Sequence, residues 1–188
     1  MRDLRDFDIL VLPGWHNSGP GHWQSEWLGF FPNMRRVEQE DWETPCYADW
    51  GKKLSAEVAG CRKPILFVAH SLGTSLVMRW AHENDARGIA GAFLVAASDR
   101  DRFDNELNAP IRGFAPMIAA PLPFPSMLLA SRNDHRVSFD RAKFFANAWG
   151  SIFVDAGSLG HMSTELGLWP QGLVWLGQFV GTLSEISN

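Results

Sequence analysis

Residues 64–75 decide the fold and read Pro-Ile-Leu-Phe-Val-Ala-His-Ser-Leu-Gly-Thr-Ser. The first part is almost wholly apolar, as is typical of a strand buried on both faces, and it ends abruptly at His70 and Ser71. A run compatible with a helix begins at once, with small residues in its first turn. The stretch therefore predicts a strand over 64–69, a sharp turn at the serine, and a helix over 72–84.

The turn carries Ser71, and Gly73 follows two positions later. This arrangement is close to the Gly-x-Ser-x-Gly nucleophile elbow, in which backbone strain lifts a serine oxygen above the sheet edge. Ala69 stands where that pattern has its first glycine. Alanine is the next smallest residue, so we expect the helix still to pack closely against the strand. The alternative interpretation is that Ser71 serves only as the N-cap of its helix.

Short apolar runs alternate with segments of helical periodicity along the rest of the chain. The expected strands cover residues 7–12, 35–40, 64–69, 89–97, 126–131 and 151–155. The expected helices cover residues 22–31, 50–61, 72–84, 139–149 and 170–184. Such alternation implies βαβ crossovers and a mostly parallel sheet covered on both faces. The sequence thus predicts one α/β domain over residues 1–188, a three-layer sandwich around a six-stranded sheet.

Local signals refine this outline at several points. Asp49 and Ser138 are expected to cap the helices that follow them. The polar strand over 35–40 is expected at an edge of the sheet. Residues 99–125 differ from the rest, because a charged start predicts a short helix to Leu107 and a proline-rich continuation predicts a loop.

Composition excludes several classes of protein. With 188 residues, 46% of them hydrophobic and 20% charged, the chain can bury a core without disulfides or a metal. A formal net charge of −4 without a long basic cluster argues against nucleic acid or an anionic membrane as a partner. The two cysteines are expected to be reduced thiols. The charged N-terminus and the lack of a long apolar run predict a cytoplasmic protein without a signal peptide or membrane span.

Reactive side chains follow three of the expected strands. Ser71 follows the third strand, Asp134 the fifth and His161 the sixth. Parallel strands end at one edge of the sheet, so the three side chains are able to meet there. Imidazole takes a serine proton near neutral pH, and a carboxylate holds the imidazole in the required tautomer. The order Ser, Asp, His is also the order found in α/β-hydrolases.

A carbonyl attacked by this serine becomes an oxyanion, which needs hydrogen-bond donors. The backbone N–H of Leu72, at the start of the helix, is expected to be one donor. The second is expected from the loop after the first strand, at Trp15 or at His16. A Pro-Gly pair before that loop lets the chain turn tightly.

Other residues compete for the acid and the base. Asp99, Asp101 and Asp104 follow the fourth strand and are alternative acids. His135 is an alternative base, although its adjacency to Asp134 makes a facing geometry awkward. The ordinary interpretations also stay open, namely an aspartate that shapes a turn and a histidine in a surface loop.

No cofactor is expected. His16 and His22 lack further metal ligands at suitable spacing, and the glycines near them do not form a dinucleotide-binding fingerprint. His70 is expected to point away from Ser71. We therefore expect chemistry performed by side chains alone.

At this point the chain resembles the small single-domain serine hydrolases similar to retinoblastoma-binding protein 9, a branch of the α/β-hydrolase superfamily. The resemblance covers essentially the whole chain and rests on residues 12–15, 21–23, 42–45, 70–73, 131–134 and 157–161. It implies Ser71 as nucleophile, Asp134 as acid and His161 as base. The sequence contains no Leu-x-Cys-x-Glu segment, so a retinoblastoma-type partner is not expected.

The predicted function is that of a carboxylesterase-like serine hydrolase, which cleaves a small uncharged or apolar ester through an acyl-enzyme. The chain has no room for a large cap domain. The expected substrate contacts are Trp15, His16, Trp23, Phe114 and Met117, for which core packing is the alternative role. Two other functions stay open: a non-catalytic binding module, and an acyltransferase or C–C bond hydrolase with the same triad.

Overall fold

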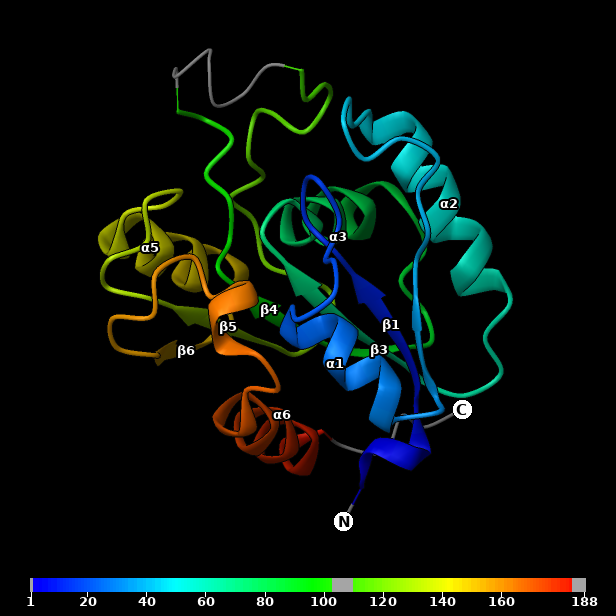
Figure 1. Cartoon of the computed structure of the whole chain (residues 1–188). Coiled ribbons are helices and arrows are strands. Elements are labelled where there is room, and N and C mark those ends of the chain that lie inside the picture. Colours follow the sequence, from blue (N-terminus) through cyan, green and yellow to red (C-terminus); the bar gives the residue numbers. More distant parts are fainter. Residues whose placement is uncertain (1, 103–109, 184–188) are drawn as a thin grey trace.

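The computed structural model describes residues 2–102 and 110–183 (Figure 1). Six strands form one sheet in the order β2-β1-β3-β4-β5-β6, and all neighbouring strands are parallel. The strands are β1 (Asp8–Leu12), β2 (Met34–Arg36), β3 (Ile65–His70), β4 (Ile89–Val95), β5 (Ser126–Ala130) and β6 (Ile152–Asp155). The predicted α/β class with a six-stranded parallel sheet is confirmed. The polar strand β2 lies at an edge, as its sequence predicted.

Helices cover both faces of the sheet (Figure 1). One face carries α1 (Trp23–Phe30) and α6 (Pro170–Thr182), and the other carries α2 (Tyr47–Ala59), α3 (Leu72–Glu83) and α5 (Phe139–Trp149). Two short 3₁₀ helices, Leu4–Asp6 and Thr164–Leu166, complete the described elements. These layers confirm the predicted three-layer sandwich.

Each face of the sheet has its own apolar core, because the central strands are buried on both sides. On the α1 and α6 face, the Trp23 ring lies 4.6 Å from that of Trp27 and 5.2 Å from that of Trp169. On the other face, the rings of Phe145 and Trp149 stack at 5.0 Å. Much of the heavy aromatic content of the sequence therefore serves as core.

The N-terminal caps predicted from local sequence are correct for α5 and wrong for α2. Ser138 caps α5, and its Oγ accepts a hydrogen bond from the N–H of Arg141, as predicted. Helix α2 begins at Tyr47, so Asp49 lies in its first turn and the prediction that it is the cap is wrong. The cause is distant in sequence, because the N–H of Tyr47 donates to the carbonyl of Arg112 at 3.0 Å.

The proline-rich stretch over 110–125 contains no described helix or strand beyond an isolated bridge between Cys46 and Arg112. The short helix expected to reach Leu107, and the alternative acid Asp104, fall in 103–109, outside the described residues. Within the described ranges, no helix has both the length and the apolar character needed to span a membrane.

Candidate active site

Ser71 lies at the turn between β3 and α3 and adopts φ 53° and ψ −120°. A positive φ is uncommon for a residue other than glycine, so the backbone is strained here. Neighbouring bonds hold the conformation: the N–H of Ser71 donates to the carbonyl of Val95 at 3.0 Å, and its carbonyl accepts from the N–H of Thr74 at 2.9 Å. The sequence therefore forms a nucleophile elbow.

Two glycines provide the space that the elbow needs. A Cβ atom at Gly73 would lie 2.3 Å from the carbonyl oxygen of Leu12, so only glycine lets α3 approach β1 this closely. A Cβ atom at Gly14 would lie 2.8 Å from the Cβ of Ser71. Ala69, where the pattern has its first glycine, is fully buried in strand pairing with β1 and β4. The elbow thus forms with alanine at that position.

The structure brings Ser71, His161 and Asp134 together. The Nε2 of His161 lies 2.8 Å from the Oγ of Ser71. Its Nδ1 lies 2.9 Å from the carboxylate oxygens of Asp134. The Asp134 side chain is 0% exposed and that of His161 is 12% exposed, so both are shielded from water while the imidazole can still reach a bound molecule. The three residues follow β3, β5 and β6, the strands after which the sequence predicted them.

Hydrogen bonds between two loops fix the imidazole relative to the carboxylate. The Oδ1 of Asn133 accepts from the N–H of Gly160 at 2.8 Å. The Oγ of Ser131 accepts from the N–H of Leu159 at 2.8 Å and donates to Asn133 Oδ1. The loop after β5 thus holds the backbone immediately before His161. These bonds help to orient the imidazole, in addition to the bonds that the imidazole itself makes.

His70 lies behind the base. Its Nε2 is 2.9 Å from the backbone carbonyl of His161, and because a carbonyl only accepts, this nitrogen carries the proton. Burial, together with the positive charge that His161 and His22 can carry, holds the pKa of His70 well below its ordinary value. The side chain is thus a neutral donor that supports the His161 backbone.

His22 is the third member of this row of rings. Its ring lies 4.8 Å from that of His70. Its Nδ1 accepts from the N–H of Gln24 at 3.2 Å and caps α1. Burial lowers the pKa of His22 to about 4. The expectation that His16 and His22 do not form a metal site stays a prediction, and the structure shows His22 as the cap of α1.

Leu72 and Trp15, the expected oxyanion-hole donors, both line the same cavity as Ser71. Leu72 is the first residue of α3, and Trp15 follows the glycine that contacts Ser71. Neither N–H donates to another group within residues 2–102 and 110–183. The N–H of His16, the alternative donor, is used by the carbonyl of Trp42 at 3.2 Å. Of the three candidate donors, Leu72 and Trp15 thus keep their N–H groups available, and their role stays a prediction.

Gln24 is a supporting residue that sequence reasoning missed. Its side chain is 0% exposed, and its Nε2 donates to the carbonyls of Leu12 and Val68 at 3.2 and 3.1 Å. Its Oε1 accepts from the Oγ of Ser18 at 2.6 Å. Gln24 therefore ties the loop after β1 to the ends of β1 and β3. A glutamine beside apolar residues of a helix was the only signal.

The competing acids and base have other partners. Asp99 and Asp101 both bind the guanidinium of Arg141, at 3.0 and 2.6 Å. The ring of His135 lies 5.6 Å from that of His161, beside the base rather than between it and the serine. Among the described candidates, Asp134 and His161 alone have the facing geometry.

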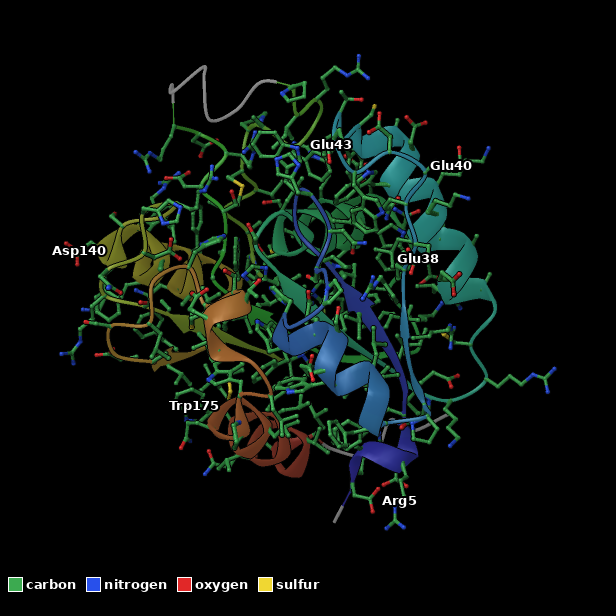
Figure 2. The ribbon with its side chains drawn as sticks, viewed as in Figure 1. Arg5, Glu38, Glu40, Glu43, Asp140 and Trp175 are labelled. Atoms are coloured by element: carbon green, nitrogen blue, oxygen red, sulfur yellow. The ribbon has the colours of Figure 1, made fainter. Side chains whose placement is uncertain are left out.

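A cavity of about 220 Å³ opens beside the serine. Its lining includes five predicted site residues, which are Trp15, His16, Ser71, Leu72 and His161. It also includes two arginines that sequence reasoning missed, Arg100 and Arg136. At its rim, the His16 ring stacks on Trp15 at 4.2 Å. The His16 Nδ1 lies 2.9 Å from a carboxylate oxygen of Glu43, which is labelled in Figure 2.

The structure places three predicted substrate contacts away from the cavity. Trp23 is 0% exposed, and its Nε1 donates to the carbonyl of Met162 in the α1 core. Phe114 is 2% exposed and packs edge-to-face on Trp50. Met117 is 9% exposed and lies against the buried Ser75. None of the three is among the described residues that line the cavity, and all three pack in the core.

Several solved structures have a fold similar to that of this chain. A YdeN-like hydrolase from Pectobacterium atrosepticum is 32% identical, with a TM-score of 0.83 over 94% of this chain and 92% of that one. The ydeN gene product of B. subtilis is 18% identical, with a TM-score of 0.67 over 94% of this chain and 100% of that one. The esterase RhEst1 from Rhodococcus sp. ECU1013 is 15% identical, with a TM-score of 0.70 over 97% and 93%. The last two similarities show the fold alone.

No curated protein sequence matches the chain. The family model described as serine hydrolase matches residues 9–178, which is most of the chain. The match includes both core layers, the elbow and the two loops that carry Asp134 and His161. The chain therefore belongs to the serine hydrolase family and has an α/β-hydrolase fold.

Proposed function

We propose that the protein hydrolyses esters with Ser71 as nucleophile, His161 as base and Asp134 as the acid that orients the base. The observation that carries the proposal is the continuous path from Ser71 Oγ through His161 to Asp134, with steps of 2.8 and 2.9 Å. An ionised carboxylate only accepts, so His161 Nδ1 carries the proton and Nε2 is left to accept from the serine hydroxyl. This is the tautomer that a general base requires.

The first half of the reaction forms an acyl-enzyme. His161 Nε2 takes the proton of Ser71 as Oγ bonds to the ester carbonyl carbon, and the carbonyl electrons move to oxygen. The N–H groups of Leu72 and Trp15 donate to this oxyanion. Collapse of the tetrahedral species breaks the bond to the alcohol oxygen, which leaves with the proton from His161. The buried Asp134 stabilises the imidazolium between these two steps.

Water completes the cycle. His161, neutral again, takes a proton from water as the water oxygen attacks the acyl carbon. The second tetrahedral species releases the carboxylic acid and returns the proton to Ser71 Oγ. Ester bonds are favoured because an alkoxide leaves more readily than an amine anion, so collapse of the tetrahedral species needs less help from the protonated imidazole. The presence of an esterase among the structural neighbours supports an ester as the substrate.

A fluorophosphonate probe and short p-nitrophenyl esters test the assignment. We expect the probe to label the wild-type protein and not Ser71→Ala, and kcat to fall by about 10⁴-fold or more in that variant. A wild-type protein that is neither labelled nor active would point to a non-catalytic binding module. Labelling that persists in Ser71→Ala would show that another residue is the nucleophile.

A matched pair of substitutions tests the acid. Asp134→Asn is expected to lower kcat by about 10⁴-fold, since the amide no longer selects the correct tautomer. Asp101→Asn removes one carboxylate that binds Arg141 instead, and is expected to retain most of the activity. A loss confined to Asp101→Asn would refute the choice of Asp134.

A further inference from the structure

His70 ends β3 and directly precedes the nucleophile, and its side chain reaches the base. The side chain is only 5% exposed, and its Nε2–H donates to the backbone carbonyl of His161 at 2.9 Å. The two residues are 91 positions apart in the sequence. One hydrogen bond therefore joins the segment that carries Ser71 to the segment that carries His161, in addition to the contact between the serine and the imidazole.

The segment around the base contains backbone conformations that need such a restraint. His161 is the third residue of a turn that closes where the N–H of Met162 donates to the carbonyl of Leu159 at 3.1 Å. Gly160, the second residue of this turn, adopts a φ of 58°. The bonds from the loop after β5 restrain only the two residues before the base. In the described part of the chain, His70 is the one residue whose side chain binds the backbone of His161 itself.

The ring of His70 is itself held in place by neighbouring rings. The ring of His22 lies 4.8 Å from it, and that of Trp23 lies 6.0 Å from it at 90°. The ring of His161 lies 5.0 Å away. A side chain packed among three rings in a dense interior has little freedom to change its rotamer. The donor to the base is therefore in position before a substrate binds.

A neutral donor suits this position. The proposed mechanism places a positive charge on His161, and a second positive charge on the neighbouring ring would oppose it. Burial holds the pKa of His70 well below its ordinary value, so this ring stays neutral at neutral pH. A lysine or an arginine would also donate to the carbonyl but would bring a charge close to the base. Histidine supplies the hydrogen bond without the charge.

We propose that His70 is a positioning residue of the reaction, which holds the main chain of His161 so that the imidazole stays aligned with Ser71 as the proton moves between them. This inference rests on the proposed function. A displacement of roughly 1 Å lowers the rate by about 10²-fold, so a bond that prevents it contributes to kcat. His161 acts in both halves of the reaction, so its misalignment slows acylation and deacylation alike and leaves KM unchanged.

Two substitutions separate the donor from the ring. His70→Gln keeps a neutral N–H donor at a similar distance from the main chain, whereas His70→Phe keeps an aromatic ring and removes the donor. With p-nitrophenyl acetate, we expect His70→Phe to lower kcat by about 10- to 100-fold and to change KM by less than about twofold. We expect His70→Gln to keep kcat within about fivefold of wild type. Equal losses of kcat in the two variants would overturn the inference.

His70 also lines the cavity, so a direct contact with the substrate is the competing explanation. Such a contact would raise KM and leave kcat unchanged in His70→Phe, because binding is lost equally in the ground state and the transition state. That result would overturn the positioning role.

Trp27→Phe is the control for a loss of stability. Trp27 lies in the same core, is 0% exposed, and its indole N–H donates to the carbonyl of Leu168 at 2.8 Å. This variant likewise removes a ring donor from a backbone carbonyl, but away from the base. We expect a lower urea midpoint of unfolding with kcat close to that of wild type. A fall in kcat as large as that of His70→Phe would mean that activity follows stability, and would contradict the proposal.

Proton NMR provides a readout that is independent of turnover. The proton on His161 Nδ1, which the imidazole shares with Asp134, gives a low-field signal that depends on the geometry of this pair. We expect the wild-type signal in His70→Gln and in Trp27→Phe, and a displaced signal in His70→Phe. An unchanged signal in His70→Phe would show that the base does not depend on His70.

A measurement on wild type keeps the proposal testable even where a variant does not fold. Long-range ¹⁵N spectra identify which ring nitrogen of His70 carries the proton. We expect Nε2, since the carbonyl of His161 only accepts. A proton on Nδ1 instead would rule out the bond and with it the inference.

The outcomes also separate this inference from the proposed function. Wild-type kcat in a folded His70→Phe overturns the positioning role and leaves the hydrolase proposal in place. No hydrolysis by wild type, together with no fluorophosphonate labelling of Ser71, overturns both.

Discussion

At the scale of single residues, the candidate site depends on a glycine, Gly14, as much as on the reactive side chain of Ser71. Ser71 holds a strained φ of 53°, and the chain opposite it at Gly14 has no Cβ atom. That missing atom leaves the serine oxygen free to take up the rotamer that meets His161. The reactivity proposed for Ser71 therefore depends on a residue that has no reactive group.

Gly14→Ala tests this dependence. The new Cβ would meet Ser71 Cβ at 2.8 Å and Oγ at 3.3 Å, so the serine must shift. We expect kcat/KM to fall by about 10²-fold, because a displacement of roughly 1 Å is costly to catalysis. Thermal denaturation provides the control: Gly14→Ala should cost less stability in a Ser71→Gly background, where the opposing atoms are gone. Additive costs would contradict the proposed contact.

The buried His22 predicts a pH dependence of stability. Its pKa is lowered from 6.5 to about 4, so the unfolded chain binds a proton at a pH where the folded protein does not. Stability is therefore fully present above pH 6.5 and is lost as the pH falls from 6.5 toward 4. The loss amounts to about 3 kcal/mol at most.

The variant His22→Asn isolates this effect. Asparagine keeps an acceptor for the N-cap of α1 but does not titrate. Urea unfolding at several pH values should show a shallower decline between pH 6.5 and 4 in the variant than in wild type. Parallel profiles would show that His22 is not the group responsible.

At the scale of elements, local sequence predicted helices well where local atoms determine their ends. Helix α5 spans Phe139–Trp149 as predicted, with the predicted cap Ser138 before it and Gly150 in the left-handed conformation after it. The start of α2 could not be predicted, because the carbonyl that holds it belongs to Arg112, in another part of the chain. Local helix propensity cannot indicate a hydrogen-bond partner that lies far away in the sequence and comes close only in the folded chain.

The packing of α3 on β1 gives a prediction at this scale. Gly73→Ala would place a methyl group 2.3 Å from a backbone carbonyl oxygen, which cannot move without distorting β1. We expect a loss of about 1–3 kcal/mol in unfolding free energy, measured by denaturant titration. The matched change Gly29→Ala, in α1 where nothing lies within 4 Å, should instead stabilise by roughly 0.5–1 kcal/mol. Equal effects would contradict the close approach.

At the scale of the whole molecule, the parallel sheet explains which parts of the site could be foreseen. Strand order alone brings Ser71, Asp134 and His161 to one edge, so the sequence sufficed to nominate them. The cavity walls could not be foreseen, because they depend on which way each side chain turns within long loops. Phe114 turns into the core, whereas Arg136 turns toward the cavity.

One bond that crosses the molecule gives the last prediction. The indole N–H of Trp23 on α1 donates to the carbonyl of Met162, next to the base, at 2.9 Å. Trp23→Phe leaves that carbonyl without its donor and should lower stability by about 1–3 kcal/mol. It should lower kcat by the same factor for short p-nitrophenyl esters of different acyl length, since the ring is not among the residues that line the cavity. A change in substrate preference would show a direct contact instead.

The elbow also has a consequence for the chain as it is made. Ser71 leaves the ribosome 90 residues before His161, the residue that activates it in the proposed mechanism. During that interval the serine has neither its base nor the strand β6 that leads to it. A nascent or truncated chain without His161 therefore carries only an unactivated hydroxyl, and the proposed chemistry requires β6 and the loop after it to have joined the sheet.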